Sequence, residues 1–270
     1  MASSDGVRDL FAPPRVLAAD GGEPGELLLR SAEELGEYPV TVVHSLREWA
    51  GIAPEHPLLS ERARGDWRTV SYGRAVAAAN GIGQALLDRG LGPGRPLLVL
   101  SGNGVDHLLV TLGAMTAGIP VAPVSVAYFA GHRDEAEQLS VLMAAIPGEA
   151  VRTAFANLSP DGTAKILFTS GSTGAPKGVL NTHRMLAANQ QMIRQAWPFL
   201  GWERPVIVDW LPWSHTFGGN HNLNMMISSG GTLYVDAGRP GSRPGVRGPL
   251  LLPAAAGVQR RRRCRGRRSS

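Results

Sequence analysis

The sequence predicts an α/β fold built from βαβ units. A short apolar run over 97–100 is followed by an uncharged helical stretch and by a second apolar run over 119–124. Such runs are typical of strands buried on both faces of a parallel sheet, and a helix between them completes one βαβ unit. Further apolar runs end at Phe168 and extend over 206–211. Strands and helices are therefore expected to alternate along most of the chain.

The first half of the chain carries clear signals for where its elements begin and end. Serine and threonine side chains accept hydrogen bonds from free N–H groups at helix N-termini, and glycine adopts the left-handed conformation that ends many helices. The expected elements are, in order, a loop-rich segment over 1–40, a short helix capped by Thr41, a hairpin of strands 58–62 and 67–70 around Gly65-Asp66, and a helix from Ser71 to about 89 that Gly90 ends.

Residues 108–131 contain no charged side chain, so a membrane-spanning helix has to be considered. Glycine and proline interrupt this stretch at Gly113, Gly118, Pro120 and Pro123. A buried helix to about 117, followed by a strand over 119–124, explains the pattern better. We therefore expect no membrane span.

The second half of the chain predicts few secondary-structure elements up to residue 160 and alternating helices and strands after residue 181. Between 128 and 160 the pattern indicates only one helix, at about 133–145. The later expected elements are a helix capped by Asn181 or Thr182 and stopped by Pro198, a strand over 206–211, a helix over 220–228 ended by Gly230-Gly231, and a strand over 232–235. The apolar spacing of the helix after 182 predicts a buried face of Met185, Ala188, Met192, Ile193 and Ala196.

Composition separates the chain into a body and a tail. The net charge is +5, but residues 241–270 hold nine arginines and no acid, which leaves 18 basic against 22 acidic residues in the first 240. The tail is rich in Arg, Gly and Pro, and we expect it to be disordered because it cannot bury enough apolar area. A single cysteine, Cys264, excludes a disulfide framework and a cysteine-based zinc site. The N-terminus lacks a secretory pattern, so the cytoplasm is the expected location.

The segment after Phe168 carries the strongest chemical signal in the chain. Glycines let a ligand approach the backbone closely, successive N–H groups form a concave nest for anions, and hydroxyls and a lysine add donors and charge. The residues of this type are Thr169, Ser170, Gly171, Ser172, Thr173 and Gly174, followed by Pro176 and Lys177. A flexible Gly/Ser linker does not explain a proline and a lysine placed directly after the tract. The composition suits the triphosphate of a nucleotide.

The spacing of this loop differs from three better-known motifs. A Walker A loop places its lysine directly after a glycine that follows four intervening residues, whereas Lys177 follows Pro176. No G-x-G-x-x-G dinucleotide fingerprint is present in the loop. The nucleophile elbow G-x-S-x-G fails as well, because Thr169 stands where its first glycine is required.

The run TSGSTGAPKG over 169–178 resembles the phosphate-loop signature of AMP-forming adenylating enzymes, the family that includes acyl- and aryl-CoA synthetases. Residues 179–183 resemble the segment that follows this loop, and LPWSHTFG over 211–218 resembles the second core motif of the family. The residues around both motifs are most similar to those of feruloyl-CoA synthase-like ligases. The resemblance covers about 9–240.

The resemblance implies both a fold and an activity. Residues 1–240 are expected to form part of the large N-terminal domain of such an enzyme, with mixed sheets and a shortened segment over 126–160. The implied activity converts a carboxylic acid, such as the aromatic acid ferulate, to an acyl-adenylate and then to its CoA thioester. Its cofactors and co-substrates are ATP, Mg²⁺ and coenzyme A.

The resemblance also assigns roles to residues. It places the β- and γ-phosphates of ATP on Thr169, Ser170, Gly171, Ser172, Thr173, Gly174 and Lys177, and gives catalytic roles to Lys177 and His215. The family's adenine-stacking aromatic residue, Mg²⁺-binding acid, ribose-binding aspartate and adenylation lysine have no matching positions here. We therefore expect an inactive or impaired fragment, truncated or frame-shifted after about 240, and leave its oligomeric state open.

His215 and the aromatic residues beside it each allow a structural and a ligand-binding interpretation. His215 is either a satisfied, partly buried histidine or, as the matching family position suggests, a residue that lines or gates the carboxylate site. Trp213 and Phe217 either form the wall of an aromatic acyl pocket or belong to the core. His221 lies six residues after His215, but two histidines without a third ligand make a weak metal site, so no protein-held metal is expected.

Two other functions are compatible with parts of the sequence. An amidase-type hydrolase would use Ser170 or Ser172 with a lysine as base, although Pro176 and the glycine spacing make that geometry awkward. The arginines over 260–268 would bind nucleic acid phosphates without sequence preference. No aromatic residue is interleaved in that cluster, so base stacking and specific nucleic-acid recognition are not expected.

Overall fold

The structure is a computed structural model that describes residues 10–23, 25–63, 66–124, 139–169, 176–236 and 250–252. Its strands are β1 (Val16–Asp20), β2 (Leu27–Ser31), β3 (Pro57–Ala63), β4 (Asp66–Ser71), β5 (Leu97–Leu100), β6 (Val121–Val124), β7 (Thr163–Thr169), β8 (Lys177–Thr182), β9 (Val206–Asp209), β10 (Thr232–Val235) and β11 (Leu250–Leu252). Its helices are α1 (Val42–Ile52), α2 (Tyr72–Asp88), α3 (Val105–Thr116), α4 (Leu139–Met143), α5 (Glu149–Ala156), α6 (His183–Ala196), η2 (Pro198–Gly201), η3 (Thr216–Asn222) and α7 (Leu223–Ser229).

Each of the two larger sheets contains both parallel and antiparallel strand pairs, which confirms the predicted α/β fold with mixed sheets. The five-stranded sheet has the order β11-β9-β10-β3-β4, with β10 parallel to β9 and β3. The four-stranded sheet has the order β5-β6-β7-β8. Strands β5 and β6 are parallel and are joined by α3, so the predicted βαβ unit is present. Within the described ranges, every helix is too short or too polar to cross a lipid bilayer.

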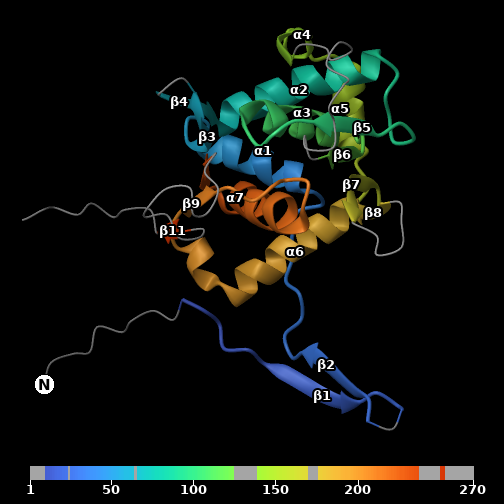
Figure 1. Cartoon of the computed structure of the whole chain (residues 1–270), viewed down its shortest axis with the longest axis vertical. Helices are drawn as coiled ribbons and strands as arrows, with labels where there is room; N and C mark the ends of the chain where they lie inside the picture. The colour runs from blue at the N-terminus through green and yellow to red at the C-terminus, as the bar shows by residue number, and fades with distance from the viewer. Residues whose placement is uncertain are drawn as a thin grey trace, which may run out of the picture.

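Helices α2 and α3 pack against each other and, with α1, lie between the two sheets (Figure 1). Tyr72, at the start of α2, is completely buried, and its hydroxyl lies 2.8 Å from the carbonyl oxygen of Met226 in α7. The predicted caps are confirmed: the hydroxyls of Thr41 and Ser71 accept from the third N–H of α1 and α2. Gly90 ends α2 with a φ of 73°.

Strand β5 differs from the prediction that it is buried on both faces. Leu98 is 48% exposed and Leu100 is 37% exposed, while Val99 between them is buried. Strand β5 is at the edge of its sheet, and α3 packs against it. The strand register places Phe168 of β7 and Leu180 of β8 on the same face as Leu98 and Leu100, and both are exposed as well.

Three further expectations need correction. The loop-rich segment 1–40 contains the exposed antiparallel hairpin β1–β2. Residues 139–160 form two short helices, α4 and α5, where one was expected, and residues 125–138 lie outside the described ranges. The buried face of α6 consists of His183, Leu186, Ala187, Gln190 and Ile193, so only Ile193 was assigned correctly. The turn of α6 that packs against η3 and α7 carries polar residues, which an apolar pattern does not identify.

The predicted tail contributes one described element. Strand β11 pairs antiparallel with β9, with Leu251 opposite Ile207. Residues 237–249 and 253–270 lie outside the described ranges, so the disorder of the tail and the boundary near 240 remain predictions.

Candidate active site

The predicted phosphate loop joins two antiparallel strands. Thr169 at the end of β7 is paired with Lys177 at the start of β8, and the Thr169 hydroxyl donates to the Lys177 carbonyl oxygen over 3.4 Å. Strand β8 was not predicted, and it brings both ends of the loop together. Thr169 and Lys177 are exposed. The remaining predicted phosphate-binding residues lie outside the described ranges, as do both serines of the amidase alternative: Ser170, Gly171, Ser172, Thr173 and Gly174.

The His215 segment connects β9 to α7 and contains a π-helix, η3. His215 is exposed and precedes this helix; its carbonyl oxygen accepts a hydrogen bond from Gly219 N over 2.9 Å. Phe217 is 53% exposed and stacks on His221, with ring centroids 4.9 Å apart. Short π-helical turns frequently occur at functional sites. Exposed His215 and Phe217 are therefore both accessible to a ligand, whereas the partly buried histidine anticipated as one interpretation is not observed.

Trp213 belongs to the core. It is 2% exposed, and its ring meets that of His107 in α3 edge to face, 5.1 Å between centroids. Burial lowers the pKa of His107 to about 4, so this histidine is neutral at pH 7. Of the two interpretations for Trp213, the structure supports packing.

Asn103 holds the chain around Trp213 and was not among the residues predicted from the sequence. Its side-chain amide donates to the Leu211 carbonyl oxygen over 2.7 Å and its oxygen accepts from Trp213 N over 3.0 Å. Asn103 follows β5, at the carboxyl end of a parallel strand, where α/β proteins commonly place site residues. In the sequence, a polar residue between Gly102 and Gly104, shortly after a predicted strand, is the signal that could have identified Asn103.

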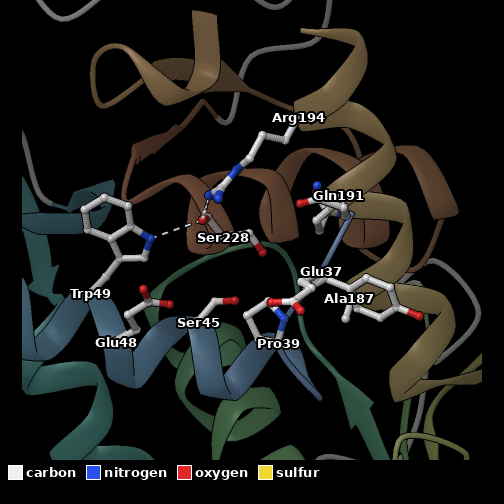
Figure 2. Close-up of a pocket in the computed structure, with 11 residues that line it drawn as sticks. Glu37, Pro39, Ser45, Glu48, Trp49, Ala187, Gln191, Arg194 and Ser228 are labelled. Carbon is white, nitrogen blue, oxygen red and sulfur yellow. Dashed lines mark hydrogen bonds between the residues drawn. The ribbon is translucent and has the colours of Figure 1, made fainter. Parts of the chain in front are cut away.

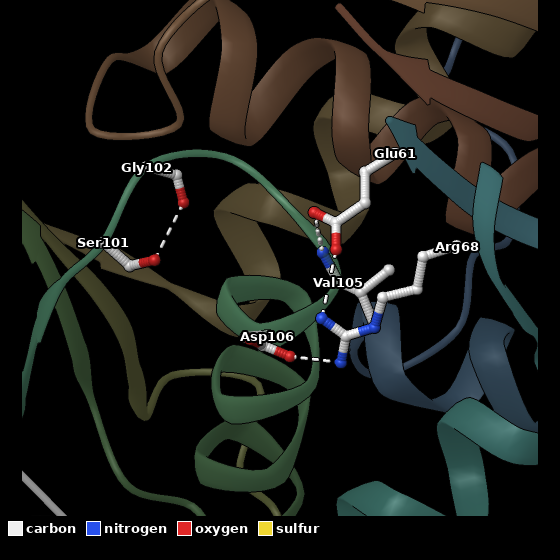
Figure 3. A network of polar contacts seen from close by, with 6 residues as sticks. All are labelled: Glu61, Arg68, Ser101, Gly102, Val105 and Asp106. Carbon is white, nitrogen blue, oxygen red and sulfur yellow. Dashed lines mark hydrogen bonds and ion pairs between the residues drawn. The ribbon is translucent and has the colours of Figure 1, made fainter. Parts of the chain in front are cut away.

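The loop that carries Asn103 is fixed at the start of α3 (Figure 3). Glu61 of β3 accepts a hydrogen bond from Val105 N over 3.0 Å and pairs with Arg68 over 3.1 Å. Arg68 also pairs with Asp106, whose hydrogen bond raises the pKa of the guanidinium. These partly exposed ion pairs add little stability individually. The contact at the start of α3 is the hydrogen bond from Val105 N to Glu61, which satisfies a free N–H of the first turn.

A network of side-chain amides connects η3 to the hairpin β7–β8 and to α6. Asn220 donates to the Asn181 side-chain oxygen over 3.0 Å, and its carbonyl oxygen accepts from Gln190 over 2.9 Å. Several buried polar atoms of this region have no protein hydrogen-bond partner among the described residues; they belong to Gln190, Trp213, Asn220 and Asn224. Burial raises the pKa of Asp209. Buried polar atoms of this kind are usually satisfied by ordered water or by a bound ligand.

A separate pocket of about 330 Å³ lies between α1, α6 and α7 (Figure 2). The carboxylates of Glu37 and Glu48 line it, and the Ser228 carbonyl oxygen accepts hydrogen bonds from Trp49 and Arg194 over 3.1 and 2.7 Å. The lining carries two carboxylates against the one guanidinium of Arg194, so its net charge is negative and disfavours the phosphates of a nucleotide.

The family model for "AMP-binding enzyme" matches this chain over residues 46–140 and 130–245. These segments include the loop hairpin and the His215 segment. The chain belongs to the AMP-binding enzyme family.

Individual AMP-binding enzymes resemble only parts of the chain. A medium-chain-fatty-acid–[acyl-carrier-protein] ligase, TtuA of Teredinibacter turnerae, is 46% identical over 78 residues, which is 29% of this chain and 12% of the relative. Fatty acyl-CoA synthetase A of Dictyostelium discoideum is 28% identical over 180 residues, 47% of this chain and 26% of the relative. This chain thus spans about a quarter or less of the length of these relatives.

Solved AMP-binding enzymes share the fold. The structure of a fatty acyl-adenylate ligase from L. pneumophila in complex with acyl adenylate and pyrophosphate matches with a TM-score of 0.60 at 21% identity. The match covers 73% of this chain and 39% of that chain. The predicted family fold is therefore confirmed, and it is partial.

Proposed function

We propose that this chain provides the phosphate-holding part of a site that activates a carboxylic acid with ATP. The observation that carries the proposal is the TSGSTGAPKG run, held at its ends by the Thr169–Lys177 pair within a chain of the AMP-binding family. The ligase from L. pneumophila binds an acyl adenylate and pyrophosphate, the two products of such a step.

In the proposed reaction, a carboxylate oxygen attacks the α-phosphorus of ATP. A new O–P bond forms, the bond from the α-phosphorus to the bridging oxygen breaks, and its electron pair leaves with pyrophosphate. The residues of the loop donate hydrogen bonds to the β- and γ-phosphates, and the Lys177 ammonium stabilises the charge that develops on the leaving group. The thiol of coenzyme A then attacks the acyl carbonyl. A C–S bond forms, the bond from the acyl carbon to the phosphate oxygen breaks, AMP leaves with its electron pair, and the thiol proton passes to solvent.

The metal of this reaction is proposed to arrive with the nucleotide. The described residues contain no group of three or more His, Cys, Asp or Glu side chains that could hold a metal ion. Mg²⁺ prefers oxygen ligands and is commonly bound through substrate phosphates with one or two carboxylates. When bound there, it would neutralise part of the triphosphate charge.

The substrate is proposed to be an aromatic acid such as ferulate. The support is the resemblance of both motifs to feruloyl-CoA synthase-like ligases and the exposed ring of Phe217, stacked on His221 beside His215. An aromatic substrate ring would pack on Phe217 at offset-stacking distance. His215, at the entrance of η3, would then lie next to the substrate carboxylate.

The loop and its supporting hairpin lie within the part of the family that this chain spans, which is 39% of the solved ligase from L. pneumophila. Phosphate binding is therefore the property to test first.

Replacing Lys177 with alanine is expected to weaken Mg·ATP binding about tenfold, because one charge-assisted contact to a phosphate is lost. Isothermal titration calorimetry of the 270-residue chain measures this directly. Arg152→Ala, which removes an exposed cation on α5, is the matched control and should leave the affinity unchanged. Equal affinity of the Lys177→Ala variant and the unmodified chain would contradict the assignment.

A further inference from the structure

Lys165 is a buried lysine without a carboxylate. It lies inside β7, is 2% exposed, and its ammonium donates to the Gly219 carbonyl oxygen over 2.9 Å. Among the described residues it forms no ion pair. An unpaired buried ammonium is costly, and an apolar side chain would fill the same space at a lower cost. A purely structural role therefore explains this residue poorly.

The position of Lys165 connects the two predicted halves of the active site. It precedes Thr169, the first residue of the loop, by four positions on the same strand. Its acceptor, Gly219, lies in η3 and donates its own N–H to the His215 carbonyl oxygen over 2.9 Å. One side chain thus links the strand that leads into the phosphate loop with the turn that carries His215.

A second contact strengthens this link. Lys165 is paired with Asn181 across the hairpin β7–β8. Asn181 binds the side chain of Asn220 over 3.0 Å, next to the Gly219 carbonyl that Lys165 binds. Two neighbouring side chains of the hairpin therefore hold two consecutive residues of η3. The ammonium contributes the charged contact, which is the stronger type of hydrogen bond.

We propose that Lys165 is a positioning residue of the phosphate site, which fixes the His215 turn against the hairpin that carries the loop. The role rests on the proposed function, because it concerns how that site is assembled. Loss of the ammonium would leave the Gly219 carbonyl without its donor and allow η3 to shift relative to the loop.

The test compares Lys165→Met, Lys165→Gln and the control Leu167→Met, an apolar exchange on the same strand at another buried position. Lys165→Met is expected to lower Mg·ATP affinity about tenfold in calorimetry. It should also accelerate amide hydrogen exchange of the peptide over 213–223 without lowering the melting temperature. Lys165→Gln should recover part of the affinity, because its amide can donate to the same carbonyl. Leu167→Met should change neither quantity.

The outcomes separate this role from the proposed function. If the unmodified chain binds Mg·ATP and Lys165→Met binds within twofold of it, the positioning role is wrong. If the unmodified chain does not bind Mg·ATP, the proposed function fails. Hydrogen exchange then tests on its own whether Lys165 positions the His215 turn. Unchanged exchange over 213–223 in Lys165→Met then overturns the role, and faster exchange confined to that peptide supports it.

Discussion

Lys165→Met is expected to raise the free energy of unfolding at pH 7 by about 1 to 2 kcal/mol. Relief of the buried ammonium contributes about 3 kcal/mol, and the Gly219 carbonyl oxygen left without its donor offsets about 1 to 2 kcal/mol of that gain. Burial lowers the pKa of Lys165 from 10.5 to about 8, so the folded protein holds an ammonium that it disfavours. Methionine has a similar length, is apolar and adapts to irregular cores. Urea denaturation of the variant and the unmodified chain at pH 7 measures the difference. A variant less stable than the unmodified chain would show that the ammonium contributes more through its hydrogen bond than its burial costs.

The same residue predicts how stability changes with pH. Below about pH 8, Lys165 is protonated in both the folded and the unfolded chain, so its destabilising effect is constant. Between pH 8 and 10.5 the unfolded chain binds more protons at this residue, and the unmodified protein gains stability as the pH rises. From pH 8 to 9.5 the difference from Lys165→Met should shrink by about 2 kcal/mol. Burial also raises the pKa of Tyr72, which lowers stability as the pH rises above 10. Tyr72 is present in both proteins, so its contribution cancels in the difference between Lys165→Met and the unmodified chain. A constant difference across this range would contradict the argument.

Greater stability combined with weaker nucleotide binding would identify Lys165 as a residue kept for function. Active sites often contain groups that destabilise the fold, and replacing them stabilises the protein at the expense of activity. A packing residue would behave differently, because its loss would lower stability and leave the affinity of the folded protein unchanged.

Gly219→Ala is expected to destabilise the fold by about 1 to 3 kcal/mol and to disturb η3. A Cβ atom at this position would overlap the Trp213 carbonyl oxygen. A Cβ atom at the preceding residue, Gly218, would lie 2.5 Å from the Leu211 carbonyl oxygen. These neighbours are backbone atoms, so they can move only if the turn before η3 changes.

The matched control for this change is Gly201→Ala at the end of η2, where a Cβ atom meets nothing within 4 Å. It should change the free energy of unfolding by no more than about 0.5 kcal/mol. Urea denaturation of both variants measures the two values. A Gly219→Ala variant as stable as Gly201→Ala would mean that the turn accepts a side chain, and that the close approach of η3 to Trp213 is not required.

Local signals predicted those parts of the fold that depend on local chemistry. Hydroxyl caps at Thr41 and Ser71 define helix starts in the sequence and in the structure, as Gly90 does for the end of α2. The βαβ unit followed from three successive patterns. In α6, by contrast, two overlapping stripes of residues compete, and the neighbours of the helix decide which is buried. Those neighbours include polar η3, so Gln190 is inside and Met185 is outside.

Candidate site residues could be proposed from the sequence where they form a motif and not where they depend on tertiary contacts. The loop and His215 were proposed from consecutive residues, and their roles remain predictions. Lys165 and Asn103 act through partners 54 and 108 positions away. Lysine is normally exposed, so its residue type argued against burial. Only the pairing of distant segments reveals that its ammonium binds η3.

The most direct test of the central claim follows the amides of Gly171 and Gly174 by ¹⁵N nuclear magnetic resonance during a titration with Mg·ATP. If the loop binds the β- and γ-phosphates, both amide signals should shift and saturate together with the affinity found by calorimetry, while the signal of Gly201 stays in place. Signals of Gly171 and Gly174 that remain unchanged at saturating Mg·ATP would contradict a phosphate-binding loop over 169–177.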